Sequence, residues 1–141
     1  MMILLTALGL IPFALGSFMN WFMMTRPDDL PPFTLFAVIT LLIWTAIAFI
    51  ANSRVKCTKK VVIFLNLVGL IDLALLGIQE LLLGAYWNNL AGPLTQFYYL
   101  PLINLGFRLT NWSHTVFSAY CAAFVLMVAA SILGCALRKK K

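Results

Sequence analysis

The stretch GLIDLALLGIQELLLGAYW, residues 69–87, decides how this chain can fold, because it reads as a membrane-spanning helix that carries two carboxylates. An ionised side chain at bilayer depth costs at least about 2.5 kcal/mol on insertion scales. Asp72 and Glu80 should therefore face protein or water and not acyl chains. The direction in which they point constrains how the other helices pack.

The composition is that of an integral membrane protein. Of 141 residues, 63% are hydrophobic and 10% are charged, whereas soluble domains are about half apolar and a quarter charged. Four apolar runs are long enough to cross a bilayer: 2–24, 33–51, 61–87 and 114–137. We expect an all-α polytopic protein, one transmembrane domain over 1–141 without a soluble domain, with four transmembrane helices in a compact bundle. The run at 2–24 lacks a positive leading segment, so we expect it to be retained and not cleaved as a signal peptide.

Basic residues collect in two clusters that predict the orientation. Eight of the ten lie beside apolar runs, and such clusters mark the cytoplasmic side of membrane proteins. Both termini are then cytoplasmic, and short connections favour a bacterial inner (plasma) membrane. We attribute the net charge of +6 to basic residues that orient the chain in the membrane, and we expect no direct nucleic-acid binding. The predicted cytoplasmic docking residues are Arg54, Lys56, Lys59, Lys60, Arg138, Lys139, Lys140 and Lys141.

The connection between the third and fourth runs is unusually apolar. Its segment at residues 95–112, TQFYYLPLINLGFRLTNW, contains five aromatic side chains. Its proline and glycine residues make a fifth membrane crossing unfavourable. An interfacial or re-entrant segment is expected, with Tyr98, Tyr99 and Trp112 near lipid headgroups. A loop folded over the outer helix ends is the alternative.

Helical periodicity predicts which faces are buried. At 100° per residue, one arc of the third run holds Asn66, Gly69, Asp72, Gly77, Glu80 and Gly84, and the other side holds Leu67, Ile71, Leu75, Ile78 and Leu82. Small residues mark close helix contacts in membranes, so the glycine arc should face protein. Matching stripes occur on the other runs: Gly9, Pro12, Gly16 and Asn20; Ala37, Thr40, Trp44 and Ala48; Ala119, Ala122, Ala123, Ala130 and Gly134. Helix packing alone accounts for them.

The polar residues divide by depth. Glu80 lies about 12 Å nearer the predicted outer surface than Asp72, where an ion pair with Arg108 or His114 is expected. Asp72 has no cation at its level. It can stay protonated and hydrogen-bond Thr40, Thr45 or a backbone carbonyl, face a wet cavity, or meet a neighbouring subunit. The candidate intramembrane polar site comprises Asp72, Glu80, Asn20, Thr40 and Asn66.

The sequence contains little that indicates enzyme chemistry. There is one histidine and no nucleophile–base set, phosphate-binding loop or metal-ligand spacing. Cys57, Cys121 and Cys135 fit neither a disulfide framework nor a zinc site, so free thiols are expected. We predict no enzyme activity, no cofactor and no metal.

Two functions of different classes remain. The first is a non-enzymatic, homo-oligomeric membrane subunit, a sensor or anchor that engages anionic lipid or a cytosolic protein partner through its basic face. This layout is similar, in architecture alone, to small four-span bacterial membrane subunits that act in immunity or defence. The alternative is a small oligomeric proton or cation channel or transporter that uses Asp72 and Glu80.

Overall fold

The computed structural model describes residues 1–26, 28–29, 31–85, 91–113 and 115–139, with the side chains of residues 91, 93 and 139 excepted. Every regular element in this part is helical: α1 (Met2–Leu8), α2 (Ile11–Thr25), α3 (Phe33–Val55), α4 (Thr58–Gly77), the π-helix η1 (Ile78–Leu82), α5 (Ala91–Tyr99), α6 (Ile103–Leu109) and α7 (Val116–Lys139). Four helical segments are long and apolar enough to cross a membrane: Met2–Thr25, Phe33–Val55, Thr58–Leu82 and Val116–Arg138. The predicted all-α class with four apolar helices is confirmed. Insertion into a membrane stays a prediction.

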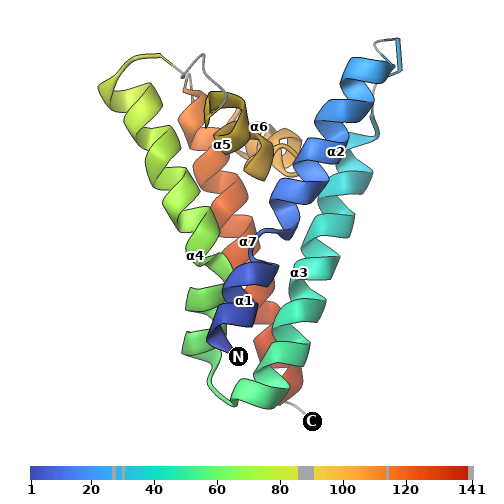
Figure 1. Ribbon diagram of the computed structural model, residues 1–141, viewed down its shortest axis with the longest axis vertical. Helices are drawn as coiled ribbons and strands as arrows, with labels where there is room; N and C mark the ends of the chain where they lie inside the picture. Colours follow the sequence, from blue (N-terminus) through green and yellow to red (C-terminus); the bar gives the residue numbers. More distant parts are fainter. Residues whose placement is uncertain (27, 30, 86–90, 114, 140–141) are drawn as a thin grey trace.

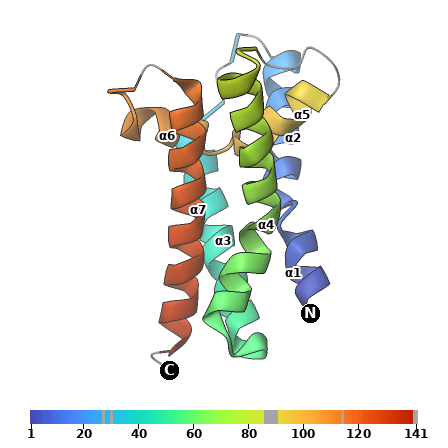
Figure 2. The ribbon, with the colours of Figure 1, turned by 90° about the vertical axis from the view of Figure 1, so that its left-hand side faces the viewer.

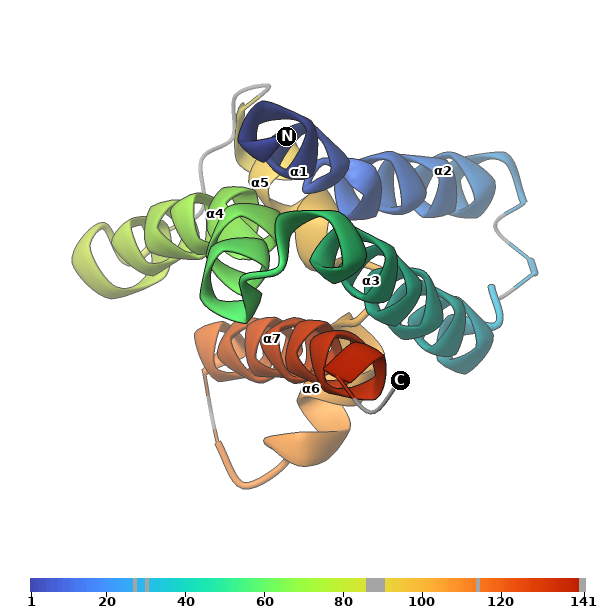
Figure 3. The same cartoon turned by 90° about the horizontal axis from the view of Figure 1, so that it is seen from below.

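The long helices converge at one end and spread apart at the other (Figure 1). The narrow end holds the first turn of α1, the α3–α4 connection and the last turn of α7 (Figures 1 and 2). Seen from that end, α3, α4 and α7 surround a common axis while α2 runs outward (Figure 3). The prediction of a compact bundle therefore describes the narrow end, and the wide end has a different architecture.

The first apolar segment is broken at Gly9 and Leu10, which separate α1 from α2. Pro12 lies in the first turn of α2, and a proline there has no N–H to bond a carbonyl of the preceding turn. The N–H of Phe13 bonds the Leu10 carbonyl at 3.1 Å and not the carbonyl of Gly9. The break frees the Gly9 carbonyl and turns α2 away from α4, so that α1 packs on α4 while α2 packs on α5.

The α5–α6 hairpin, which is α5, α6 and the turn between them, occupies the wide end (Figure 1). Its apex carries Tyr98, Tyr99 and Leu102, each at most 1% exposed. Helix α5 packs between α2 and α4, and α6 crosses α7. Two glycines allow these backbone crossings: a Cβ on Gly16 would lie 1.7 Å from the Phe97 carbonyl oxygen, and one on Gly106 would lie 2.3 Å from the Ala119 carbonyl oxygen. The hairpin therefore fills the space that the spread helices leave.

Replacing Gly16 tests whether α2 depends on its contact with α5. In Gly16→Ala the new Cβ meets main chain and not a flexible side chain, and forced overpacking typically costs about 1–3 kcal/mol. We expect a lower thermal midpoint in detergent for this variant. Ala14→Val, which enlarges an exposed position of the same helix, is the control. Equal midpoints for Gly16→Ala and the wild type would contradict the packing of α2 on α5.

Candidate functional site at the basic end of the bundle

A buried polar network joins α3, α4 and α7 midway along the helices. The indole Nε1 of Trp44 donates to Asn66 Oδ1 at 3.1 Å. Asn66 Nδ2 donates to the Ser131 hydroxyl at 2.9 Å and to the Val62 carbonyl at 2.8 Å. Trp44, Asn66 and Ser131 are all at most 4% exposed. The predicted polar residue Asn66 is thus a fully satisfied structural residue that fixes three helices against one another.

The predicted packing stripe of α3 is confirmed, since Ala37, Thr40, Trp44 and Ala48 are all buried. The hydroxyl of Thr40 donates to the Phe36 carbonyl within its own helix at 2.7 Å. This local bond leaves Thr40 outside any intramembrane network. Asn20, another member of the predicted polar site, is half-buried on α2.

Asp72 lies beside the apex of the α5–α6 hairpin. Tyr99 donates its hydroxyl to the Gly69 carbonyl at 2.6 Å, one turn of α4 before Asp72, and Tyr98 donates to the Gly9 carbonyl at 3.1 Å. Burial, and then the nearby Asp72 carboxyl, raise the pKa of Tyr98 well above its usual value, so Tyr98 stays a donor. Both rings are buried in the protein core and so cannot contact headgroups, while the expected depth of Tyr98 and Tyr99 near the headgroup level stays a prediction.

One oxygen of the Asp72 carboxyl has no partner. Its Oδ2 is buried and makes no hydrogen bond within the described chain. The threonines proposed as its partners use their hydroxyls elsewhere: that of Thr45 donates to the Leu41 carbonyl at 2.8 Å. The half-buried side chain of Asp72 therefore stays a candidate for the three roles that the sequence left open.

A π-helical turn after Gly77 changes which side chains of the third span point toward the protein core. In η1 the N–H of Leu83 bonds the Ile78 carbonyl, five residues back, at 3.1 Å. A π-turn holds more residues than an α-turn, so the 100° spacing no longer applies. Gln79 becomes fully buried while Glu80 is half-buried. One of the two expected partners of Glu80, His114, lies outside the described residues, so the ion pair of Glu80 with Arg108 or His114 stays a prediction.

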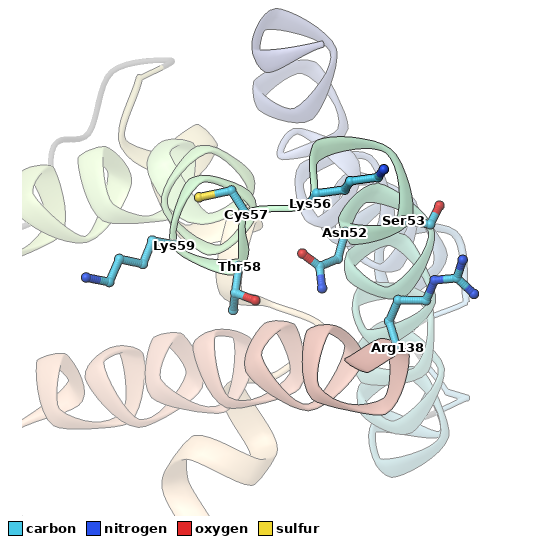
Figure 4. Close-up of a pocket in the computed structure, with 7 residues that line it drawn as sticks. All are labelled: Asn52, Ser53, Lys56, Cys57, Thr58, Lys59 and Arg138. Carbon is cyan, nitrogen blue, oxygen red and sulfur yellow. The ribbon is translucent and has the colours of Figure 1, made fainter. Parts of the chain in front are cut away.

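At the narrow end a cavity of about 540 Å³ lies between the ends of α3, α4 and α7. We call it the end cavity. Its lining contains three cationic side chains and no acid, and comprises Asn52, Ser53, Lys56, Cys57, Thr58, Lys59 and Arg138. Asn52 and Thr58 point into the space between the helices, whereas the long basic side chains extend outward around the rim (Figure 4). The cavity thus has Asn52 and Thr58 at its floor, while the charged ends of the three basic side chains point away from it.

The backbone brings these residues together through a two-residue turn. Lys56 ends α3 in the left-handed region, with φ of 52°, which costs a side-chain-bearing residue about 1–2 kcal/mol. Its N–H bonds the Asn52 carbonyl at 3.0 Å, and α4 begins two residues later at Thr58. Arg138 comes from α7, where its guanidinium lies 5.7 Å from the centre of the Phe49 ring. The tight turn therefore places the ends of α3 and α4 against the end of α7.

Two buried oxygens of the cavity have no hydrogen-bond partner in the described chain: Asn52 Oδ1 and Thr58 Oγ1. Asn52 is 6% exposed, and its Nδ2 donates to the Cys135 carbonyl of α7 at 3.2 Å. Helix α4 starts without a side-chain cap, so its first N–H groups carry the partial positive charge of a helix N-terminus. Buried polar atoms without partners are rare in proteins and indicate that a water, ion or ligand completes the site.

The other predicted docking residues lie around the same end. Arg54 and Lys60 are exposed, and Arg54 lines a separate groove of about 190 Å³ against α1. Lys139 belongs to α7, although only its backbone is described, and Lys140 and Lys141 lie outside the described residues. Sequence reasoning therefore found the cations of this site from their clustering. It missed Asn52 and Thr58, which had no signal beyond being polar residues next to a basic cluster.

The structure holds no obvious metal centre or disulfide in the part of the chain that it describes. No three His, Cys, Asp or Glu side chains there come together in a way that could hold a metal ion. The three cysteines form no disulfide among the described residues: Cys57 and Cys121 are half-buried, and the buried Cys135 donates its thiol to the Ala48 carbonyl at 3.8 Å. Cys57 lines the end cavity without a bonded sulfur partner.

The polar network around Asn66 predicts a specific loss of stability. Asn66→Leu removes the acceptor of the Trp44 indole, and a buried donor left unpaired costs about 1–3 kcal/mol. We expect a lower unfolding midpoint in dodecyl sulfate titrations of mixed micelles. Thr45→Val removes a hydroxyl that bonds only within its own helix and should change the midpoint less. A midpoint for Asn66→Leu that equals the wild-type value would show that the network does not stabilise the fold.

Comparisons with protein-family models, with curated proteins and with solved structures find no match for this chain.

Proposed function

We propose that this chain is a non-enzymatic, multi-pass membrane subunit that anchors itself to anionic lipid through its basic end, with both termini in the cytoplasm of a bacterial cell. In this arrangement the α5–α6 hairpin dips into the membrane from the outer side. The observation that supports the proposal is the end cavity, where Lys56, Lys59 and Arg138 surround a polar floor without any acid. Association of several copies, or of a cytosolic partner at the same end, stays a prediction.

The distribution of charge supports the same proposal. Asp28 and Asp29 lie in the α2–α3 connection at the wide end, and Asp72 and Glu80 lie along the third span, so the described cations of the narrow end have no acidic neighbours in sequence. A Lys or Arg near an anionic membrane surface contributes about 1 kcal/mol of attraction. The simplest alternative is that these cations only orient the chain during insertion. Lipid binding by the folded protein separates the two.

The test measures which lipids stay with the protein. Purified protein is reconstituted into nanodiscs of equimolar phosphatidylglycerol and phosphatidylcholine, re-extracted in mild detergent, and the retained lipids are counted by mass spectrometry. We expect the wild type to retain mainly anionic lipid. In the five-site variant the cations of the narrow end are changed to Gln: Arg54, Lys56, Lys59, Lys60 and Arg138. Its enrichment in anionic lipid should be at least about fivefold lower than that of the wild type, because a loss of even about 1 kcal/mol of binding free energy is a factor of five.

The matched control changes the cations outside this cluster. Arg26→Gln combined with Arg108→Gln removes positive charge at the wide end and should leave the enrichment unchanged. Equal enrichment for the wild type and the five-site variant would reject anchoring to anionic lipid. Orientation alone would then account for the cluster.

A second candidate function is conduction of protons or small cations past Asp72 in an oligomer. The unpartnered Oδ2 of Asp72, next to two tyrosine hydroxyls and a broken helix, favours this candidate. Interrupted helices and membrane-depth carboxylates often line ion pathways. Four helices alone rarely enclose a pore, so conduction requires several copies.

Flux through liposomes tests this candidate. Asp72→Asn keeps the size of the side chain and removes its charge, so we expect proton or sodium flux at least about tenfold lower than in the wild type if Asp72 binds the ion. Glu80→Gln serves as a comparison nearer the wide end. Equal flux in wild type and Asp72→Asn, or no flux in either, rejects conduction through this carboxylate.

A further inference from the structure

We propose that the end cavity binds one anionic phospholipid through a headgroup that carries hydroxyl groups, that is, a phosphate diester of glycerol or another polyol. This inference rests on the proposed function, since it names the lipid class that the basic end holds. It goes beyond charge attraction, because the floor of the cavity contains both donors and an acceptor. Each part of the headgroup has a counterpart among the described residues.

The phosphate can be reached by cations and by a helix N-terminus. Lys56, Lys59 and Arg138 line the cavity with their side chains extended outward, so binding requires the flexible lysine side chains to turn toward the phosphate, and Arg138 contacts the Phe49 ring. The N-terminus of the 20-residue helix α4 opens at the same place without a side-chain cap, and uncapped helix N-termini favour anions. The unpartnered Thr58 hydroxyl adds a neutral donor.

The headgroup hydroxyl has an acceptor in Asn52. The amide orientation is determined by its surroundings: Nδ2 donates to the Cys135 carbonyl at 3.2 Å, and turning the amide over would place two oxygens against each other. Oδ1 therefore faces the cavity as an acceptor, and it is buried without a partner. A phosphodiester without hydroxyl groups offers only acceptors to Asn52, whereas inorganic phosphate and, in part, a phosphate monoester carry a P–OH at neutral pH. A lipid phosphodiester that satisfies both Asn52 Oδ1 and the cations must carry a hydroxyl donor next to its negative charge.

The position and size of the cavity favour a lipid over a free phosphate. Its lining comes from the last residues of the span Phe33–Val55, the first residues of Thr58–Leu82 and the last residue of Val116–Arg138. These are the levels at which headgroups meet helix ends. The volume of about 540 Å³ is that of a small-molecule site, and an inorganic phosphate would fill only part of it.

Native mass spectrometry of delipidated protein measures the preference directly. The probes are phosphatidylglycerol, phosphatidylmethanol, which is a diester of the same charge without a headgroup hydroxyl, phosphatidylcholine and soluble glycerol phosphate. We expect the wild type to bind phosphatidylglycerol roughly threefold to tenfold more tightly than phosphatidylmethanol, which is the effect of one net hydrogen bond. Phosphatidylcholine should bind most weakly among the lipids. Soluble glycerol phosphate should fail to displace phosphatidylglycerol at equal concentration.

Variants at the floor of the cavity separate the two kinds of contact. Asn52→Leu should bind phosphatidylglycerol and phosphatidylmethanol equally, because it removes the acceptor for the hydroxyl and leaves the cations. Thr58→Val should weaken both lipids by roughly threefold to tenfold without loss of stability, since its hydroxyl has no partner in the described chain. The control is Ser118→Ala, which lies near the other end of α7 and donates its hydroxyl to the nearby Thr115 carbonyl at 2.6 Å. It should keep the wild-type preference.

The outcomes distinguish this inference from the proposed function. If the wild type retains anionic lipid but does not distinguish phosphatidylglycerol from phosphatidylmethanol, or if Asn52→Leu keeps the preference, the headgroup assignment is overturned and anchoring by charge survives. Displacement by soluble glycerol phosphate would overturn the assignment to a lipid. If Asn52→Leu fails to fold, unchanged binding of both lipids by a stable Thr58→Val would overturn the site. If the wild type shows no enrichment in anionic lipid, the proposed function itself is rejected.

Discussion

The hydrogen bonds from Tyr98 and Tyr99 to two backbone carbonyls are the constraint on which the architecture depends. In apolar surroundings a carbonyl without a donor costs several kcal/mol, and the break at Gly9 creates such a carbonyl about one third of the way along the segment Met2–Thr25. Tyr98 supplies the donor at 3.1 Å, and Tyr99 bonds the Gly69 carbonyl of α4 at 2.6 Å. These bonds hold the α5–α6 hairpin between the helices at their wide end, where α5 packs on α2 and α4 and α6 packs on α7.

This dependence explains which parts of the fold the sequence could predict. The stripe Ala37, Thr40, Trp44 and Ala48 was predictable because α3 is one uninterrupted α-helix in which the 100° spacing holds along its whole length. The same spacing failed beyond Gly77, where the π-turn buries Gln79 in place of Glu80. The position of Tyr98 was also not predictable, because its acceptor on Gly9 is 89 residues away in the chain and exists only because the first span breaks. Local patterns predict continuous helices well, and they do not predict contacts that depend on an interruption elsewhere.

The end cavity shows the same division between local and non-local information. Its cations were predictable, since Lys56, Lys59 and Arg138 belong to clusters that mark helix ends in any polytopic protein. Its floor was not, because Asn52 acquires its role from the Cys135 carbonyl of α7, 83 residues away. Close approach of α3 and α7 requires Gly134, where a Cβ would lie 2.2 Å from the Thr45 carbonyl oxygen. The network of Asn66 fixes α3, α4 and α7 one level above and so keeps the floor in place.

Two levels of the molecule contain buried oxygens without partners, and the physical chemistry of the two levels differs. Asp72 lies near the middle of the apolar helical segment Thr58–Leu82, where a charged carboxylate in a bilayer would have to be neutral, hydrated or shared with another chain. Asn52 Oδ1 and Thr58 Oγ1 lie where three apolar segments end, near three cationic residues and an uncapped helix N-terminus. In the proposed arrangement a lipid headgroup reaches this level without crossing the hydrocarbon. A buried atom without a partner in the middle of an apolar segment costs stability, whereas at the basic helix ends the proposed headgroup would hydrogen-bond it. This difference is why the narrow end, and not the level of Asp72, carries the main proposal.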